Sequence, residues 1–168
     1  WLKRELAKSD ATWKVIASDM PIGLLVPDGD RWEAVANGDN GDAKGREMEV
    51  AEALRFIKQE NILNTVWLTA DVHYTAAHHY SPERAAFQDF EPFWEFVSGP
   101  IHAGTFGPND LDMTFGPEVR FVKAPAEGQV NLPPSAGLQF FGLVEIDGES
   151  EAMTVRLMDA DDQELWST

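Results

Sequence analysis

The chain contains no cysteine, which excludes disulfide bonds and thiolate metal sites but leaves open sites built on histidine and carboxylates. Basic residues are scarce, because 13 Lys and Arg stand against 29 Asp and Glu, for a formal net charge of -16. Nucleic-acid binding needs cationic side chains against the phosphates, so this balance argues against a nucleic-acid partner. No apolar run reaches the roughly 20 residues that cross a bilayer, so we expect no membrane span.

Several motifs of common enzyme classes are also missing. The sequence has neither a phosphate-binding P-loop nor the glycine fingerprint of dinucleotide-binding folds. It has no Gly-x-Ser-x-Gly turn, and Ser98 and His102 have no carboxylate at a spacing that would complete a catalytic triad. These absences make serine-nucleophile chemistry a weak contender.

What the sequence does contain is enough apolar material for one domain. Its 168 residues are 43% hydrophobic and include six Trp and ten Phe, whose large side chains supply buried surface. Neither an internal repeat nor a low-complexity tract divides the chain. We therefore expect residues 1–168 to lie within a single domain.

The amino-terminal half predicts helices alternating with strands. The chain opens with WLKRELAKSD, which has the pattern of an amphipathic helix. Because the sequence begins inside this expected helix, we interpret it as a piece of a longer protein. The expected elements are a helix over Trp1–Ser9, a strand over Trp13–Ser18, an acidic and mobile surface loop over Asp28–Gly45, a helix over Gly45–Glu60 and a doubly buried strand over Thr65–Ala70.

The carboxyl-terminal half is richer in strands. They are expected over Phe93–Ser98, Val119–Lys123, Leu138–Ile146, Met153–Met158 and Glu164–Ser167. Two long segments rich in Gly, Pro and Asn, residues 99–117 and 124–137, lie between them, and loops of that length are often functional. This order of elements predicts an α/β fold whose second half is mostly antiparallel.

The stretch VWLTADVHYTAAHHY places three of the four histidines just after a predicted buried strand. If the strand continues through Asp71 and His73, their side chains share one face and Val72 points back into the core. A carboxylate and an imidazole beyond the carboxyl end of a strand suit a divalent or trivalent metal. A triplet this short also arises by chance, so the motif alone leaves metal binding and an ordinary strand end both open.

Other polar residues are further candidates. His78 and His79 are adjacent, so in a strand they face opposite sides and at most one can reach the same spot. His78 and His102 are candidates for substrate contact, although a lone histidine such as His102 is more often an ordinary loop or core residue. Asp19 follows the strand over Trp13–Ser18, where it is a ligand, a partner of a ligand, or simply a turn residue.

Four longer stretches resemble the alkaline phosphatase D (PhoD-like) family of metallophosphatases. They are WLKRELAKSDATWKVIASDMPIG, VWLTADVHYTAAHHY, FWEFVSGPIHAGTFGPNDLDMTFGPEV and NLPPSAGLQFFG. They follow the family's order with similar spacing and cover nearly the whole chain. Ala70 stands where many relatives have glycine before the aspartate, so a small residue is kept.

This resemblance implies a fold, an activity and a site. The fold would be part of a calcineurin-like metallophosphoesterase sandwich of mixed β-sheets flanked by helices. The function would be metal-dependent hydrolysis of small phosphate esters at a two-metal centre, with iron and calcium as the metals that the family suggests. Asp71 and His73 match the family's late Asp-x-His ligands, and His73 is also our candidate catalytic residue. Members are commonly exported, so we expect a periplasmic or secreted parent protein.

The family's other metal ligands lie before the position that matches Trp1. We therefore expect residues 1–168 to be the carboxyl-terminal part of one PhoD-like metallophosphatase domain, with an incomplete metal centre and little or no activity alone. Apolar surface exposed by truncation would favour self-association. The alternative interpretation is a noncatalytic, acidic, β-rich binding module, which the missing ligands favour.

Overall fold

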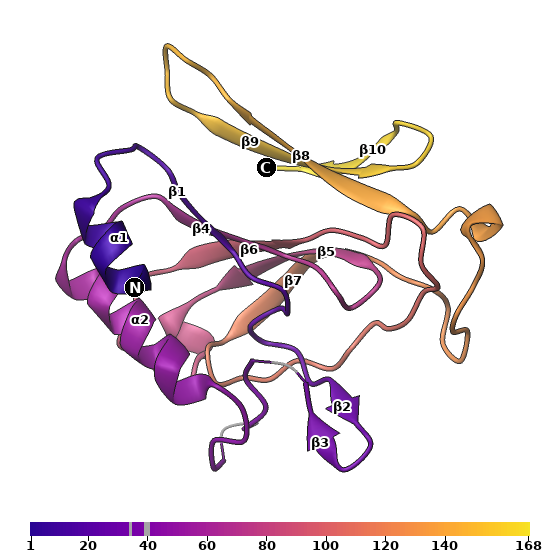
Figure 1. The fold of residues 1–168 in the computed structure, drawn as a ribbon, viewed down its shortest axis with the longest axis horizontal. Helices are drawn as coiled ribbons and strands as arrows, with labels where there is room; N and C mark the ends of the chain where they lie inside the picture. Colours follow the sequence, from indigo (N-terminus) through magenta and orange to yellow (C-terminus); the bar gives the residue numbers. More distant parts are fainter. Residues whose placement is uncertain (34, 39–40) are drawn as a thin grey trace.

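A five-stranded sheet lies at the centre of the computed structural model, which describes residues 1–33, 35–38 and 41–168 (Figure 1). Its strand order is β1-β4-β6-β5-β7, in which β1, β4 and β6 pair in parallel and β5 and β7 are antiparallel to their neighbours. The bounds are β1 (Lys14–Ala17), β4 (Thr65–Thr69), β5 (Thr75–Tyr80), β6 (Phe93–Val97) and β7 (Pro117–Lys123).

Strand β4 lies inside this sheet because its sequence, TVWLT, offers apolar side chains to both faces. Val66 and Trp67 are successive residues, so they face opposite sides, and both are buried. Trp67 joins the core on the helix side of the sheet, whereas Val66 joins the core beneath a second sheet. This is the pattern of a strand covered on both faces, as the apolar run predicts.

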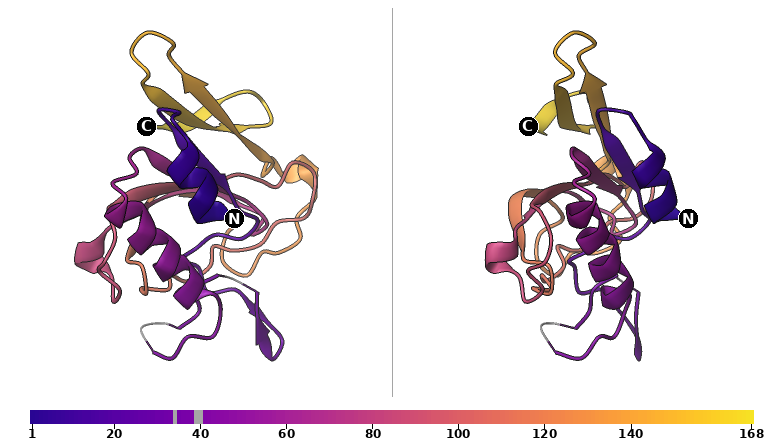
Figure 2. Two further views of the ribbon diagram at one scale, coloured as in Figure 1. Left: turned by 60° about the vertical axis from the view of Figure 1, so that its left-hand side comes forward. Right: turned by 90° about the vertical axis from the view of Figure 1, so that its left-hand side faces the viewer.

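Helices α1 (Leu2–Lys8) and α2 (Glu47–Gln59) lie on one face of the sheet (Figures 1 and 2). Apolar residues recur along α2 at helical spacing, which puts Val50, Leu54 and Ile57 on one buried stripe. The stripe shares a core cluster with Leu6, Ile16, Trp67, Tyr80 and Phe93.

The other face carries a three-stranded antiparallel sheet (Figure 1). It consists of β8 (Phe140–Ile146), β9 (Met153–Asp159) and β10 (Glu164–Ser167), with β9 in the middle. Val155 and Leu157 of β9 pack in one core cluster with Phe96 of the central sheet. The fold is therefore layered as sheet, sheet and helices.

The segment between β1 and α2 differs from the expected surface loop. Its start forms a short hairpin of β2 (Pro27–Asp28) and β3 (Arg31–Trp32), and residues 36–38 are buried. The Glu47 carboxylate accepts hydrogen bonds from the N–H groups of Asn37, Lys44 and Gly45. Burial alone would raise the pKa of the Glu47 carboxyl, because it disfavours the charged form. The backbone donors outweigh this effect and hold the pKa below its ordinary value. The surface-loop prediction is wrong for residues 36–38, and residues 34, 39 and 40 of that loop lie outside the described residues.

Strand β5 is the main element that the sequence analysis left out. Its sequence, TAAHHY, shows no clear alternation because five of its six residues are buried, on both faces of the sheet. The mixed α/β class is confirmed, as are the two expected α-helices and the other strands of the two larger sheets. Single 3-10 turns at η1 (Pro82–Arg84) and η2 (Pro134–Ala136) complete the elements. None of the helices in the described ranges has the length and apolar character that crossing a bilayer requires.

Candidate functional site

The three parallel strands of the central sheet, β1, β4 and β6, have their carboxyl ends side by side. The N–H of Ala70 donates to the carbonyl of Asp19 (2.9 Å), which joins the end of β4 to the end of β1. The N–H of Ser98 donates to the carbonyl of Thr69 (3.0 Å), which joins the end of β6 to β4. Ligands of open α/β sheets bind beyond the carboxyl ends of strands, so the loops that follow β1, β4 and β6 form the candidate site.

Asp71 and His73 follow β4 in a turn rather than in the strand itself. The strand ends at Thr69, and both residues have left-handed backbone with a φ of 61°. Asp and His are among the non-glycine residues that enter this region most readily. Val72 between them is buried in the core, as the sequence predicts. The Asp71 carboxylate and the His73 imidazole therefore line the same two surface hollows because of a tight turn, and not because of strand alternation.

The His73 ring is held by two contacts. Its Nδ1 donates a hydrogen bond to the carbonyl of Gly104 (2.6 Å), because a carbonyl oxygen can only accept. The ring of Phe106 lies with its centroid 5.1 Å from that of His73. Because Nδ1 carries the hydrogen of this bond, the lone pair of the neutral imidazole lies on Nε2. Metal-binding histidines are commonly oriented in this way, by a backbone carbonyl that accepts a hydrogen bond from the other ring nitrogen.

Two hollows meet at Asp71 and His73, which line both. The larger, of about 600 Å³, is acidic, since Asp28 of β2 and Glu33, which follows β3, also line it. The smaller, of about 260 Å³, is bordered by residues 98–103 of the loop after β6, including His102. Of the further candidates Asp19, His78 and His102, it is His102 that shares a hollow with the Asp-x-His pair.

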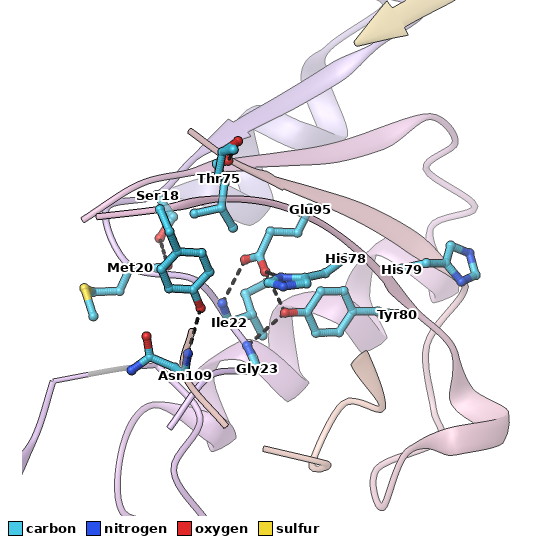
Figure 3. Close-up of polar contacts among 12 residues, drawn as sticks. Ser18, Met20, Ile22, Gly23, Thr75, His78, His79, Tyr80, Glu95 and Asn109 are labelled. Carbon is cyan, nitrogen blue, oxygen red and sulfur yellow. Dashed lines mark hydrogen bonds and ion pairs between the residues drawn. The ribbon is translucent and has the colours of Figure 1, made fainter. Parts of the chain in front are cut away.

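Asp19 and His78 lie elsewhere. Asp19 is exposed and lines neither hollow, although its carbonyl takes part in the strand junction. His78 is buried on the helix side of β5, and Figure 3 shows it turned toward Glu95 and Tyr80 while His79 points away. The two histidines therefore face opposite sides, as strand alternation predicts.

His79 packs on the other face of the sheet and lines neither hollow. Its ring lies edge-on to Trp94, with centroids 4.9 Å apart, and the Arg84 guanidinium donates to its backbone carbonyl. Desolvation, followed by the charges of Arg84 and Arg120, lowers the pKa of His79. This histidine is therefore held in its neutral form by its surroundings at neutral pH.

A buried polar cluster centred on Glu95 of β6 was not found from the sequence (Figure 3). The Glu95 carboxyl accepts hydrogen bonds from the N–H of Ile22 (2.8 Å) and the hydroxyl of Tyr80 (2.7 Å), and its Oε2 lies 3.0 Å from His78 Nδ1. The Tyr80 oxygen in turn accepts from the N–H of Gly23 (2.9 Å). The one signal in the sequence is a lone carboxylate in the aromatic strand FWEFV, because a buried carboxyl group needs partners.

This cluster anchors the chain that leaves β1. Ile22 and Gly23 are held by Glu95 and Tyr80, and the N–H of Leu25 donates to the carbonyl of Asp110 (2.8 Å). The next residues, 26–28, line the larger hollow. The buried cluster therefore determines where one wall of the candidate site stands.

The two tyrosines of the chain, Tyr74 and Tyr80, are both buried and allow a test of this packing. Burial raises the pKa of Tyr74 to about 12, and burial followed by the Glu95 carboxyl raises the pKa of Tyr80 well above its ordinary value. An unfolded tyrosine titrates near pH ~10, so only the unfolded chain releases these protons between pH ~10 and ~12, and stability falls over that range. We expect near-ultraviolet absorbance to show no ionised tyrosine up to about pH 11. Both tyrosines should then ionise together when the chain unfolds at higher pH. A tyrosine that ionises near pH ~10 in the folded chain would contradict this.

The donors at the site fit two positions of a metal centre. The exposed Asp71 carboxylate has no hydrogen bond or ion pair to any of the described residues, and His73 offers Nε2. A carboxylate oxygen and an imidazole nitrogen are ordinary ligands of divalent and trivalent metals. No group of three His, Asp or Glu in the described ranges could hold a metal ion by itself. Asp71 and His73 could therefore supply two ligands, and by themselves they do not make a complete metal site.

A family model described as PhoD-like phosphatase matches residues 1–157, which include the three parallel strands and both hollows. No curated protein matches the chain.

Proposed function

Because this chain belongs to the PhoD-like phosphatase family, we propose that it carries part of the active site of a metal-dependent phosphatase acting on small phosphate esters. In this proposal Asp71 and His73 are two of the metal ligands. Residues 1–168 are the carboxyl-terminal part of the catalytic domain, and residues that precede Trp1 in a longer protein supply the remaining ligands.

One observation carries the proposal. Asp71 and His73 line the same two hollows beyond the carboxyl ends of three parallel strands. The Gly104 carbonyl occupies Nδ1 of His73, so Nε2 is the nitrogen with a free lone pair. A carboxylate and an oriented imidazole at such a place are what a hydrolytic metal centre requires.

The residues of this chain have separate tasks in such a reaction. A bound metal pair would polarise the phosphoryl oxygens and supply hydroxide at neutral pH. His73 has one nitrogen left, so it binds a metal or donates a proton but not both, and we assign it to the metal. The proton for the leaving oxygen then comes from His102, which borders the smaller hollow. Phe106 restricts the rotation of the His73 ring.

We extend the proposal to the fold, the metals and the export of the parent protein. The layers of two sheets and helices are compatible with part of a calcineurin-like sandwich. A carboxylate suits calcium and an imidazole suits iron, which supports these metals for the centre. Activity toward both monoesters and diesters, and export of the parent protein, are further parts of this proposal.

The substitutions Asp71→Ala and His73→Ala, made in the full-length parent, test the ligand assignment. We expect each to lower the metal content and to slow hydrolysis of p-nitrophenyl phosphate by about a hundredfold or more, because even groups that only orient a ligand contribute about 10–100-fold. Metal per protein, measured by plasma mass spectrometry, is read beside the rate.

Two exposed or partly exposed residues that line neither hollow provide matched controls. Asp110→Ala and His79→Ala should retain both metal and activity, because neither side chain lines a hollow that Asp71 and His73 share. If the ligand variants keep their metal and behave like these controls, the noncatalytic binding module becomes the better interpretation.

The substitution His102→Gln tests the proposed proton donor. An alkyl phosphate needs a proton on its leaving oxygen, whereas p-nitrophenolate leaves without one. We therefore expect the variant to hydrolyse alkyl phosphates about a hundredfold more slowly, with p-nitrophenyl phosphate hydrolysis and metal content nearly unchanged. Equal slowing of both substrates would assign His102 to binding rather than to proton transfer.

A further inference from the structure

The two long segments rich in Gly and Pro meet beside the candidate site. The segment after β6 carries Gly104 and Phe106, the two residues that contact the His73 ring. Thr105 lies between them and is fully buried. The segment between β7 and β8 binds this threonine, so it acts on the residues that hold His73 without contacting His73 itself.

Thr105 accepts hydrogen bonds from two consecutive residues of the second segment. The N–H of Asn131 donates to the Thr105 carbonyl (2.6 Å), and the N–H of Leu132 donates to Thr105 Oγ1 (3.3 Å). Asn131 has left-handed backbone with a φ of 58°, a conformation that asparagine tolerates better than most residues. This turn brings two successive N–H groups to a single residue.

The side chain of Asn131 also packs directly over Gly104. A Cβ on Gly104 would collide with Asn131 Oδ1 and would lie 3.1 Å from Asn131 Cα. Glycine permits this close approach because it has no side chain. The carbonyl that accepts from His73 Nδ1 therefore belongs to a residue that Asn131 covers from the other segment.

Further contacts fix the first segment to the start of the second sheet. Gln139 is buried, and its Nε2 donates to the carbonyl of Ala103 (3.3 Å). The N–H of Phe140, the first residue of β8, donates to the carbonyl of Pro100 (2.8 Å). The loop that borders the smaller hollow is thus bound at residues 100, 103 and 105 by residues 131–140.

From these contacts we propose that Asn131 and Leu132 are positioning residues for the His73 imidazole. Their N–H groups hold Thr105, and so they keep the Gly104 carbonyl and the Phe106 ring where these select one tautomer and one orientation of His73. Groups that orient a metal-binding histidine typically contribute about 10–100-fold to metal affinity. The inference deepens the proposed function and rests on it only in taking Nε2 of His73 as a metal-binding atom.

Asn131→Pro and Asn131→Gly form a matched pair, because both remove the side chain. Proline also removes the N–H and cannot adopt a φ of 58°, whereas glycine keeps the N–H and the backbone conformation. Nitrogen-15 NMR of the metal-free, full-length parent at about pH 8, where an ordinary histidine is neutral, reads the tautomer of His73. We expect hydrogen on Nδ1 alone in the unaltered protein and in Asn131→Gly, and a mixture of tautomers in Asn131→Pro. The signal is identified by its loss in His73→Ala.

Titration with Co²⁺, followed by visible absorbance, measures metal affinity beside the tautomer. We expect Asn131→Pro to bind Co²⁺ about tenfold more weakly or worse, and Asn131→Gly to stay close to the unaltered protein. The signal of the buried His78, whose Nδ1 lies 3.0 Å from Glu95 Oε2, should not change and shows that the core is folded.

The two readouts separate the positioning role from the proposed function. Hydrogen on Nδ1 alone in Asn131→Pro, or the same mixture of tautomers in both variants, would overturn the positioning role. A changed tautomer in Asn131→Pro without loss of Co²⁺ affinity would support that role and contradict His73 as a metal ligand.

Thr105→Val and Thr105→Ser test the same contact if Asn131→Pro does not fold. Valine keeps the volume of threonine but removes the acceptor of the Leu132 N–H, whereas serine keeps the hydroxyl and loses a methyl group. If Thr105 only filled space, serine would be the more harmful change, because the residue is fully buried. We expect the reverse order, with a mixed His73 tautomer and several-fold weaker Co²⁺ binding in Thr105→Val. A greater effect of serine on the tautomer would overturn the proposal.

Discussion

Glu95→Ala is expected to lower the free energy of unfolding by about 3–5 kcal/mol, the typical cost of removing one partner from a buried polar pair. Glu95 is fully buried and accepts from Ile22 N–H, the Tyr80 hydroxyl and His78 Nδ1. Without it, three donors remain in the core with no acceptor, and each such group costs about 1–3 kcal/mol. Urea unfolding followed by tryptophan fluorescence measures the change.

Two companion variants make this result specific. Glu118→Ala removes an exposed carboxylate that pairs with Arg84 and Arg120, so its cost should be about 1 kcal/mol or less. Glu95→Gln keeps the shape and one acceptor oxygen, so its effect should lie between the two. If Glu95→Ala proves as mild as Glu118→Ala, the cluster does not hold the chain after β1.

Gly107→Ala is expected to be the second most damaging change, at about 3 kcal/mol. Gly107 has a φ of +82°, which costs a residue with a Cβ about 1–2 kcal/mol. The added Cβ would also lie 2.5 Å from two ring carbons of Tyr74, and such overpacking costs about 1–3 kcal/mol. The Tyr74 ring is buried and its hydroxyl accepts from Asn109 N–H (3.3 Å), so it has little freedom to move.

Gly128→Ala is the matched control for this change. Gly128 has a similar φ of +77°, but nothing lies within 4 Å of its added Cβ. It should therefore show only the backbone cost of about 1–2 kcal/mol, and the difference between the variants in thermal unfolding measures the clash with Tyr74. Similar melting temperatures for the two alanine variants would show that the Tyr74 ring can shift aside.

Much of the fold was predictable because its elements have local signals. The helical spacing of Val50, Leu54 and Ile57 marks α2, and the apolar run TVWLT marks a strand buried on both faces. The Asp-x-His pair was found because it follows that strand directly. Strand β5 was not predicted because burial on both faces removes the alternation that identifies strands.

The buried cluster had no comparable local signal. Glu95 lies 73 residues from Ile22 in the chain and 17 from His78, and nothing near FWEFV indicates either partner. Likewise, the Gly104 carbonyl that orients His73 is 31 residues away. Hydrogen bonds of this kind depend on how strands and loops assemble, so a pattern of neighbouring residues cannot predict them.

The sequence by itself determined the α/β class, the family and the place of Asp71 and His73 after a buried strand, because periodicity and motif order are properties of neighbouring residues. Only the tertiary structure decided that a left-handed turn presents the pair, that His102 shares a hollow with them while His78 belongs to the core, and that the buried Glu95 holds the chain after β1. The reason is that each of these facts depends on which distant segments pack together, and that is settled by the shared burial of their side chains.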